Sequence, residues 1–318
     1  MNGLTNHPPA RRLRQRGAAV ILALLTLALV AGIAASTLGD LGVAMDHVSG
    51  QHDQIQARQF ARGAIDWARN VLADDARNST VDHLGEAWAT RIPPTPVEEG
   101  EVAGDLKDQS GLFNLNNLYQ NGGSDALAME QFQTLLELLG VNGSDALRLT
   151  NALLDWLDSD SSPRPKGGAE ADYYASLGSA IRPANAPLIA VAELRQVRGF
   201  STDLVARLTP FVTAIPTGTQ INVNTAPAEV LAAAIPGLGL DGARSVIQER
   251  QRAWYKDIND FSARLPKKNL SPDTSRLATT SRYFLATGRA RFGVSVVRME
   301  VLLDRKQTWP EILWHKQL

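Results

Sequence analysis

The longest apolar run of the chain lies near its beginning, where residues 18–38 (AAVILALLTLALVAGIAASTL) contain no charged side chain. As an α-helix, this run of 21 residues extends ~30 Å, about the thickness of the hydrocarbon core of a bilayer. A helix satisfies its backbone polar groups internally, as lipid requires. The pattern therefore predicts a transmembrane helix over residues 18–38.

The helical pattern continues beyond the apolar run, with apolar side chains spaced among polar ones up to about residue 77. These are Leu41, Val43, Ile55, Phe60, Ile65, Trp67, Val71 and Leu72. Residues 10–92 contain no proline, whereas residues 91–101 (RIPPTPVEEGE) contain three, which end a helix. We therefore expect one long helix, the first half in lipid and the second half outside.

Two patterns follow the prolines. Rough alternation of apolar and polar residues predicts strands at 101–108 and again at 282–305. Between them, apolar residues at spacings of three and four predict amphipathic helices within 132–140, 147–157 and 191–212, with Ser201 or Thr202 as an N-cap. The pattern predicts an α+β fold in which a large helical block is inserted between an early and a late strand.

The distribution of charge along the chain predicts its orientation across the membrane. The 318 residues carry a net charge of −1, but residues 1–17 contain four arginines and no acid. The remainder therefore has 28 basic and 33 acidic residues, a net charge of −5. Basic residues before the apolar run and acidic ones after it predict a cytoplasmic N-terminus and an exported C-terminal part. The absence of cysteine excludes disulfides, thiolate metal sites and cysteine nucleophiles.

Two alternatives for the apolar run remain open. A buried helix of a soluble protein rarely carries so long an uncharged run beside an arginine cluster. A cleaved secretory signal has a shorter apolar region, ~7–15 residues, although residues 34–36 (AAS) resemble its cleavage site. The continuing helical pattern favours a retained membrane helix.

Carboxylates are dense in residues 155–174 (DWLDSDSSPRPKGGAEADYY). They are Asp155, Asp158, Asp160, Glu170 and Asp172. Oxygen ligands on a flexible loop are what Ca²⁺ prefers. The loop is not an EF-hand, because Pro163 and Ala169 occupy positions six and twelve counted from Asp158. A solvated turn, partly neutralised by basic residues, and the acid/base pair of a hydrolase remain as alternatives.

A second motif lies in residues 221–261, where PGLG (236–239) between two helices resembles a helix-hairpin-helix DNA-binding module. A membrane-anchored DNA receptor of the competence type has a similar NVNTA…PG pattern. The segment contains four basic and five acidic residues, which weighs against phosphate binding. Asparagines in this segment and in residues 110–118 are predicted to cap turns, with Thr225 as a helix N-cap. These asparagines are Asn114, Asn116, Asn117, Asn222 and Asn224.

The start of the chain resembles a type IV prepilin leader. Arg16-Gly17-Ala18 precedes the apolar helix, which implies cleavage between Gly17 and Ala18 by a prepilin peptidase and N-methylation of Ala18. Pilin-type subunits usually carry Glu five residues after the cut, where this chain has Leu22. The member that characteristically lacks this Glu is the K-type minor pseudopilin of type II secretion.

The resemblance to the K-type pseudopilin extends over about residues 12–304, through the stretches 81–89, 110–118, 155–170 and 221–237. It implies a pilin-like N-terminal helix packed on a small antiparallel sheet, with a large inserted all-α domain of two SAM-like or helix-hairpin-helix-like subdomains. The implied divisions are a leader (1–17), a transmembrane helix (18–38), a pilin-like helix with the first strands (39–109), two helical subdomains (110–217 and 218–281) and C-terminal strands with a tail (282–318).

The resemblance also implies a function. The chain would be a non-enzymatic minor pseudopilin of the bacterial inner membrane, at the tip of the periplasmic pseudopilus. Its expected partners are the I- and J-type minor pseudopilins, met through residues 40–77, other pseudopilins, the prepilin peptidase and the membrane, but no nucleic acid. The family binds structural calcium in the acidic loop. It tends to have an acid where this chain has Ala171, so that either Asp172 substitutes or one ion is lost or weakened.

Overall fold

The computed structural model describes residues 15–178, 181–267 and 269–318. A single helix, α1 (Gln15–Asn78), runs for 64 residues, as the unbroken pattern predicts. Its stretch 17–49 is exposed throughout, and the helix is long and apolar enough to cross a membrane, with a mean hydropathy of 2.7 over its most apolar window. Residues 1–14 of the predicted leader, with Arg11, Arg12 and Arg14, lie outside the described residues.

The second half of α1 packs on one face of a five-stranded antiparallel sheet of order β1-β2-β9-β10-β11. The strands are β1 (Ile92–Val97), β2 (Gly100–Asp108), β9 (Tyr283–Phe292), β10 (Ser295–Asp304) and β11 (Glu311–Gln317). Alternate residues of β9 and β10, such as Phe284 and Val301, form a core with Ile65 and Leu72 of α1.

Small residues bring α1 close to the sheet. Gly104 and Gly288 are paired across β2 and β9. A Cβ at Gly288 would lie 2.6 Å from the carbonyl oxygen of Ala61, so a larger residue there would push the helix away. The helix contributes the buried Ala57, Ala61 and Ala68 to the same contact.

The two edges of the sheet differ. β1 carries three prolines, which suits an edge strand because proline donates no backbone hydrogen bond. β11 is formed by a segment for which the pattern predicts no strand; it pairs with β10, for example Val301 with His315. This segment is therefore a strand because it pairs with β10, and not because its own residues alternate in the pattern of a strand.

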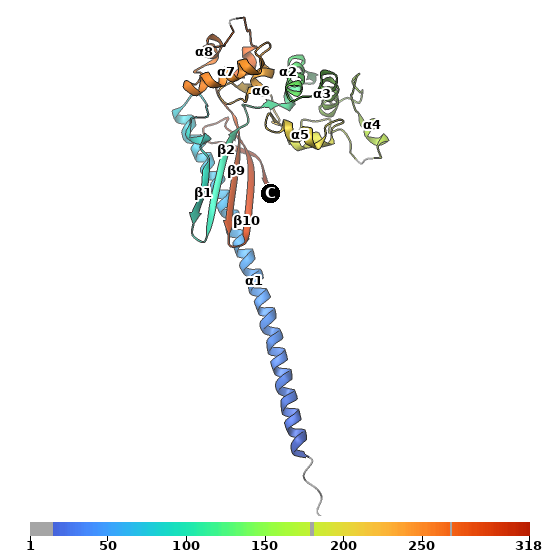
Figure 1. The fold of residues 1–318 in the computed structure, drawn as a ribbon, viewed down its shortest axis with the longest axis vertical. Coiled ribbons are helices and arrows are strands. Elements are labelled where there is room, and N and C mark those ends of the chain that lie inside the picture. Colours follow the sequence, from blue (N-terminus) through green and yellow to red (C-terminus); the bar gives the residue numbers. More distant parts are fainter. Residues whose placement is uncertain (1–14, 179–180, 268) are drawn as a thin grey trace, which may run out of the picture.

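The helical block lies between β2 and β9, and Figure 1 shows it at the end of α1 that is opposite the exposed half. Its helices are α2 (Ala126–Leu138), α3 (Gly143–Leu157), α4 (Ala171–Ser176), α5 (Thr202–Leu208), α6 (Ala228–Ala234), α7 (Gly239–Arg252) and α8 (Ile258–Ala263). Ser201 is the N-cap of α5, as predicted, and accepts a hydrogen bond from the backbone of Leu204. Buried side chains from both halves of the block form one hydrophobic cluster, separate from the core under α1.

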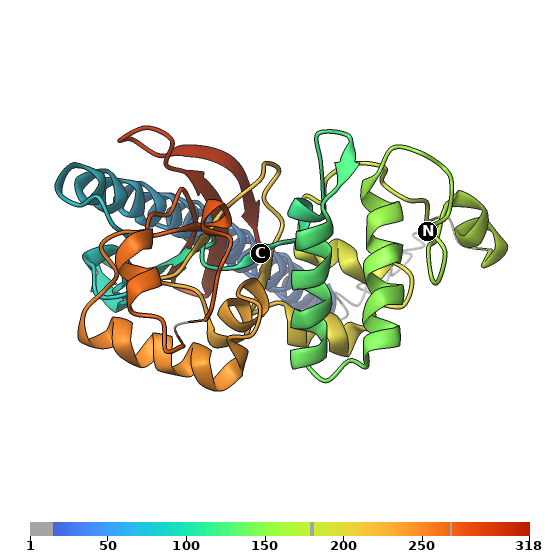
Figure 2. The same cartoon turned by 90° about the horizontal axis from the view of Figure 1, so that it is seen from above.

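The block also contains short strands that the periodicity does not predict. They are β3 (Phe113–Asn114) with β6 (Val212–Thr213), β4 (Tyr119–Gln120) with β5 (Gly123–Ser124), and β7 (Ile221–Asn222) with β8 (Leu277–Ala278). Two of the pairs are parallel, and each of these joins the beginning of one half of the block to its end. Figure 2 shows the two halves beside one another.

The asparagines bind distant backbone as well as local turns. Asn116 accepts from the backbone N–H of Leu188 and donates to the carbonyl of Ile215, 99 positions away. Asn224 exchanges two hydrogen bonds with the backbone of Tyr255. These side chains therefore join segments that the sequence separates.

The architecture confirms the predicted fold class: a long apolar N-terminal helix, a small antiparallel sheet and an inserted block that is mainly helical. The SAM-like character of the subdomains stays a prediction.

Candidate functional site

The acidic loop brings three carboxylates together. Oxygens of Asp158, Asp160 and Glu170 lie within 4.8 Å of one another. Asp158 follows the last turn of α3, and Glu170 is the residue before α4. Asp158 is 2 % and Glu170 5 % exposed, whereas Asp160 is exposed. The cluster is thus a partly buried carboxylate site with one side open to solvent.

Tight backbone contacts shape this loop. Gly167 has φ +116°, a conformation that disfavours any residue with a side chain. A Cβ on Gly168 would clash with the carboxylate of Asp155 and the backbone of Arg164. Asp155, fully buried, accepts a hydrogen bond of 3.1 Å from the backbone N–H of Arg164. Asp155 therefore stabilises the loop through its backbone, next to the three clustered carboxylates.

The positive charge beside the cluster is small compared with its negative charge. Arg164 lies 3.5 Å from Asp155 and 3.4 Å from Asp158. Burial, followed by repulsion from Asp155, Asp158 and Asp160, raises the pKa of Glu170 to about 7. Burial also raises the pKa values of Asp155 and Asp158. The environment of the folded loop thus disfavours the ionised form of these three carboxylates.

Two oxygens of the cluster lack a partner. Within the described part of the chain, Asp158 Oδ1 and Glu170 Oε1 are buried and form no hydrogen bond. Buried polar atoms without partners are rare and point to an ion or water. Carboxylate oxygens are hard ligands that Ca²⁺ accepts in variable geometry. The donor set and its orphaned oxygens fit a calcium ion held by Asp158, Asp160 and Glu170.

The sequence also predicts Asp155 and Asp172 as ligands. Asp155 already accepts from the Arg164 backbone. Asp172 is exposed in the first turn of α4 and is not part of the three-carboxylate group. The structure therefore brings Asp158, Asp160 and Glu170 together and leaves Asp155 and Asp172 outside this group.

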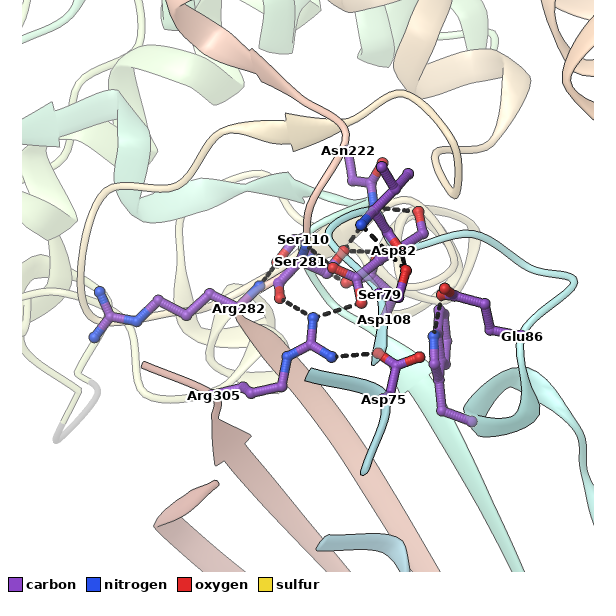
Figure 3. A network of polar contacts seen from close by, with 12 residues as sticks. Asp75, Ser79, Asp82, Glu86, Asp108, Ser110, Asn222, Ser281, Arg282 and Arg305 are labelled. Atoms are coloured by element: carbon purple, nitrogen blue, oxygen red, sulfur yellow. Dashed lines mark hydrogen bonds and ion pairs between the residues drawn. The ribbon is translucent and has the colours of Figure 1, made fainter. Parts of the chain in front are cut away.

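A second polar network joins the helical block to α1 and the sheet (Figure 3). Arg305, just after β10, donates to Asp75 at 2.6 Å, to Asp82 and to the carbonyl of Ser281 at 2.8 Å. Asp82 also accepts from the backbone N–H of Ser281. Residues from the end of α1, the loop after it and the segment just before β9 are thus held by one guanidinium.

The same network includes another group of three carboxylates, Asp75, Asp82 and Glu86. Arg305 neutralises the first two, and Glu86 accepts from the Trp88 indole at 2.7 Å. The ion pairs with Arg305 and the hydrogen bond from Trp88 therefore explain why these three carboxylates lie close together. Local patterns did not single out its members, because Arg305 lies 223 or more positions from its acidic partners.

Asp108, at the end of β2, connects this network to the second half of the block. It accepts from the hydroxyls of Thr225 and Ser281 and from the backbone N–H of Ser110. Thr225 is thus not the predicted helix N-cap, a position taken by Pro227 before α6. Burial raises the pKa of Asp108 to about 6, although these hydrogen bonds oppose the rise.

This pKa predicts a pH dependence. The folded protein holds the Asp108 proton more tightly than the unfolded chain, whose reference pKa is 3.8. The contribution of Asp108 to stability is therefore present at low pH and is lost as the pH rises from about 4 to about 6. Relative to Asp108→Asn, the wild-type free energy of unfolding should fall by roughly 1–2 kcal/mol over that range. Urea unfolding of both proteins at a series of pH values measures the effect, and a wild-type free energy of unfolding that rises relative to that of Asp108→Asn over this range would contradict the assignment.

The hairpin between α6 and α7 has the glycine geometry of a tight turn, with positive φ at Gly237 and Gly239. Of the basic residues that could bind phosphate, Arg250 instead donates to the carbonyls of Val223 and Ala226. Burial lowers the pKa of Arg250 to about 10. The arginine therefore stabilises the preceding turn, which weakens the DNA-binding alternative.

The predicted processing residues lie in the exposed first part of α1. Gly17, Ala18 and Leu22 are exposed, and nothing lies within 4 Å of a Cβ built on Gly17. The structure thus leaves these positions on the surface of the helix.

Comparison with known proteins identifies the family. Its profile, described as "Type II secretion system (T2SS), protein K", matches residues 111–217 and 221–280 in two segments. Type II secretion system protein K of Pseudomonas aeruginosa is 33 % identical over 303 residues, covering 92 % of this chain and 89 % of that protein. The protein of the same name from Pectobacterium carotovorum is 32 % identical over 306 residues, covering 92 % and 93 %.

A solved structure has the same fold. A chain of the GspK-GspI-GspJ complex from the enterotoxigenic Escherichia coli type 2 secretion system superimposes with a TM-score of 0.78 and 26 % identity, covering 86 % of this chain and 99 % of that chain. The sequence comparison and the structural comparison thus each cover most of the length of this chain. The chain belongs to the type II secretion system protein K family.

Proposed function

We propose that this chain is a minor pseudopilin that caps the tip of a short periplasmic filament. Its N-terminus lies in the cytoplasm, α1 anchors it in the inner membrane, and the sheet and helical block lie in the periplasm. The role is structural, without catalysis. The membrane part rests on the apolar run in α1, and the orientation rests on the arginines before that run and the acids after it.

The position of the helical block carries the proposal of a tip. The block lies at the end of the molecule opposite the exposed half of α1 (Figure 1). In a filament whose subunits align their long helices, this block occupies the space where the next subunit would stack. Leu22 adds to the argument, because it offers no carboxylate to the N-terminal amine of a subunit above it.

The surface of α1 beyond the apolar run supports helical partners. Leu41, Val43, Met45, Val48 and Ile55 are each more than half exposed. Such a set of apolar side chains suits packing against other long helices. Because the related structure is a GspK-GspI-GspJ complex, we infer that I- and J-type minor pseudopilins cover this helix. Other pseudopilins and the prepilin peptidase complete the inferred set of partners.

Cross-linking tests the tip role, since the chain has no cysteine of its own. Single variants Ile55→Cys, on α1, and Arg244→Cys, exposed on α7, are compared in cells that assemble the filament. We expect disulfide cross-links to other pseudopilins, carrying matched cysteines, from position 55 and none from position 244. Equal cross-linking of both positions to another pseudopilin would show a subunit above the block and contradict a cap.

Mass spectrometry of the mature N-terminus tests processing. We expect a chain that begins with N-methylated Ala18 in normal cells and an uncut chain in cells without prepilin peptidase. A chain that begins near Thr37 would identify a cleaved secretory signal and overturn the membrane-anchored pseudopilin.

We further propose that the acidic loop binds calcium, with a structural effect. The support is the buried, unpartnered oxygens of Asp158 and Glu170 beside Asp160. These residues would hold the ion, which would supply the positive charge that Arg164 provides only in part. The loop between α3 and α4 would be more rigid as a result.

A further inference from the structure

A pocket of about 340 Å³ opens beside the acidic loop, between α3 and α5. Three arginines line it, Arg148, Arg198 and Arg207, against one acid, Asp145. The pocket therefore has a surplus of two positive charges, although the exported part of the chain as a whole is acidic. A local excess of this kind attracts an anionic group.

The arginines are not neutralised by carboxylates elsewhere. Arg148 pairs with Asp145, but in the described part of the chain Arg198 and Arg207 form no ion pair. Their side chains donate hydrogen bonds to backbone carbonyls instead, Arg198 to Gly168 at 2.9 Å and Arg207 to Leu139 at 2.8 Å. A guanidinium has five N–H donors, so each retains donors for a ligand.

The remaining walls of the pocket are partly apolar. Val141, Leu149 and Leu204 add apolar surface beside the arginines. The backbone at Gly167 approaches the stem of Arg148, where a Cβ would lie 2.7 Å from its side chain. Arg198 stacks on the ring of Tyr173, 4.2 Å from its centroid. These contacts hold Arg148 and Arg198 in position beside the apolar side chains of the pocket.

We propose that this pocket binds the C-terminal carboxylate of a partner polypeptide, with the last side chain beside Val141, Leu149 and Leu204. Arginine binds carboxylates in a bidentate manner, and a chain end places a carboxylate next to one side chain. The volume is near the lower end of ~300–1,000 Å³ for small-ligand sites, which suits a terminal residue. The inference does not depend on the tip role or on calcium.

Calorimetry on the full chain in detergent micelles tests the site with two probes. One is an N-acetylated tetrapeptide that ends in leucine with a free carboxylate, and the other is the same peptide as a C-terminal amide. We expect the acid to bind and the amide to bind at least about tenfold more weakly, because the amide loses the charge-assisted hydrogen bonds. Equal binding of the two peptides, or no binding of the acid, would overturn the proposal.

Variants locate the binding. Arg148→Gln with Arg207→Gln keeps most of both stems and should weaken binding of the acid by at least about tenfold. The matched control is Arg195→Gln, an exposed arginine that does not line the pocket, which should leave binding unchanged. Equal melting temperatures establish that the variants fold. If the double variant binds as the wild type does, or if inorganic phosphate displaces the peptide more effectively than acetate does, the pocket is not a carboxylate site.

Discussion

Arg305→Ala is expected to destabilise the folded protein by about 3–5 kcal/mol, because it leaves Asp75 and Asp82 buried without a counter-charge. The side chain of Arg305 is only 8 % exposed and contacts both acids. It also lies over the ring of Phe284, 4.7 Å from the centroid. Thermal unfolding in detergent measures the effect, a fall in Tm on the order of 10 °C.

The control for this prediction lies on β10, the strand that precedes Arg305. Arg298 of β10 forms an ion pair of 3.0 Å with Glu300, but its side chain is 53 % exposed. Arg298→Ala should therefore cost less than about 1 kcal/mol. If Arg305→Ala costs no more than this control, the buried network does not hold the block.

A second variant separates the lost charge from lost packing. Asp82→Asn in the Arg305→Ala background removes one uncompensated charge while keeping an oxygen that accepts from Ser281. We expect this combination to recover part of the lost stability, a non-additive result typical of residues in one network. An additive further loss would instead assign the effect of Arg305 to packing.

The second large effect concerns calcium. At a calcium concentration about 100 times the dissociation constant, binding should add about 2.7 kcal/mol of stability, and a chelator should remove it. Glu170→Gln should weaken calcium binding by at least about tenfold, the loss that even indirect partners of metal ligands cause. Calcium titration followed by thermal unfolding of the full chain measures both.

The sign of the Glu170→Gln effect depends on the ion. In chelator the variant should be at least as stable as the wild type, because it lacks the buried charge that repels Asp155, Asp158 and Asp160. In calcium it should be less stable. The control Asp203→Asn, exposed at the start of α5, should behave as the wild type does in both conditions. A wild-type Tm that is insensitive to chelator would contradict the calcium site.

Asp172→Asn distinguishes the sequence prediction from the geometry. Asp172 is exposed and lies outside the group formed by Asp158, Asp160 and Glu170. An unchanged calcium affinity would leave that group as the ligand set. A large loss would instead make Asp172 the substitute for the acid that is absent at Ala171.

Local patterns were sufficient for the elements that a short stretch of chain decides. The apolar run and the absence of proline predict α1, and alternation predicts β2, β9 and β10. The same patterns gave no strand at residues 311–317, where only Ile312, Leu313 and Trp314 of the seven residues are apolar and the strand β11 forms by pairing with β10. A strand at a sheet edge depends on its neighbour more than on its own periodicity.

The sequence by itself determined the membrane-crossing length of α1, the charge difference between the two sides of its apolar run, the inserted position of the helical block and the density of acids in its loop. These properties follow from composition and spacing within a few turns of chain. Only the tertiary structure decided that Asp158, Asp160 and Glu170 converge, that Arg305 binds Asp75 and Asp82, and that Thr225 meets Asp108. Such contacts join residues that the sequence separates, up to 230 positions for Asp75 and Arg305, and their geometry is set by the packing of whole elements against one another.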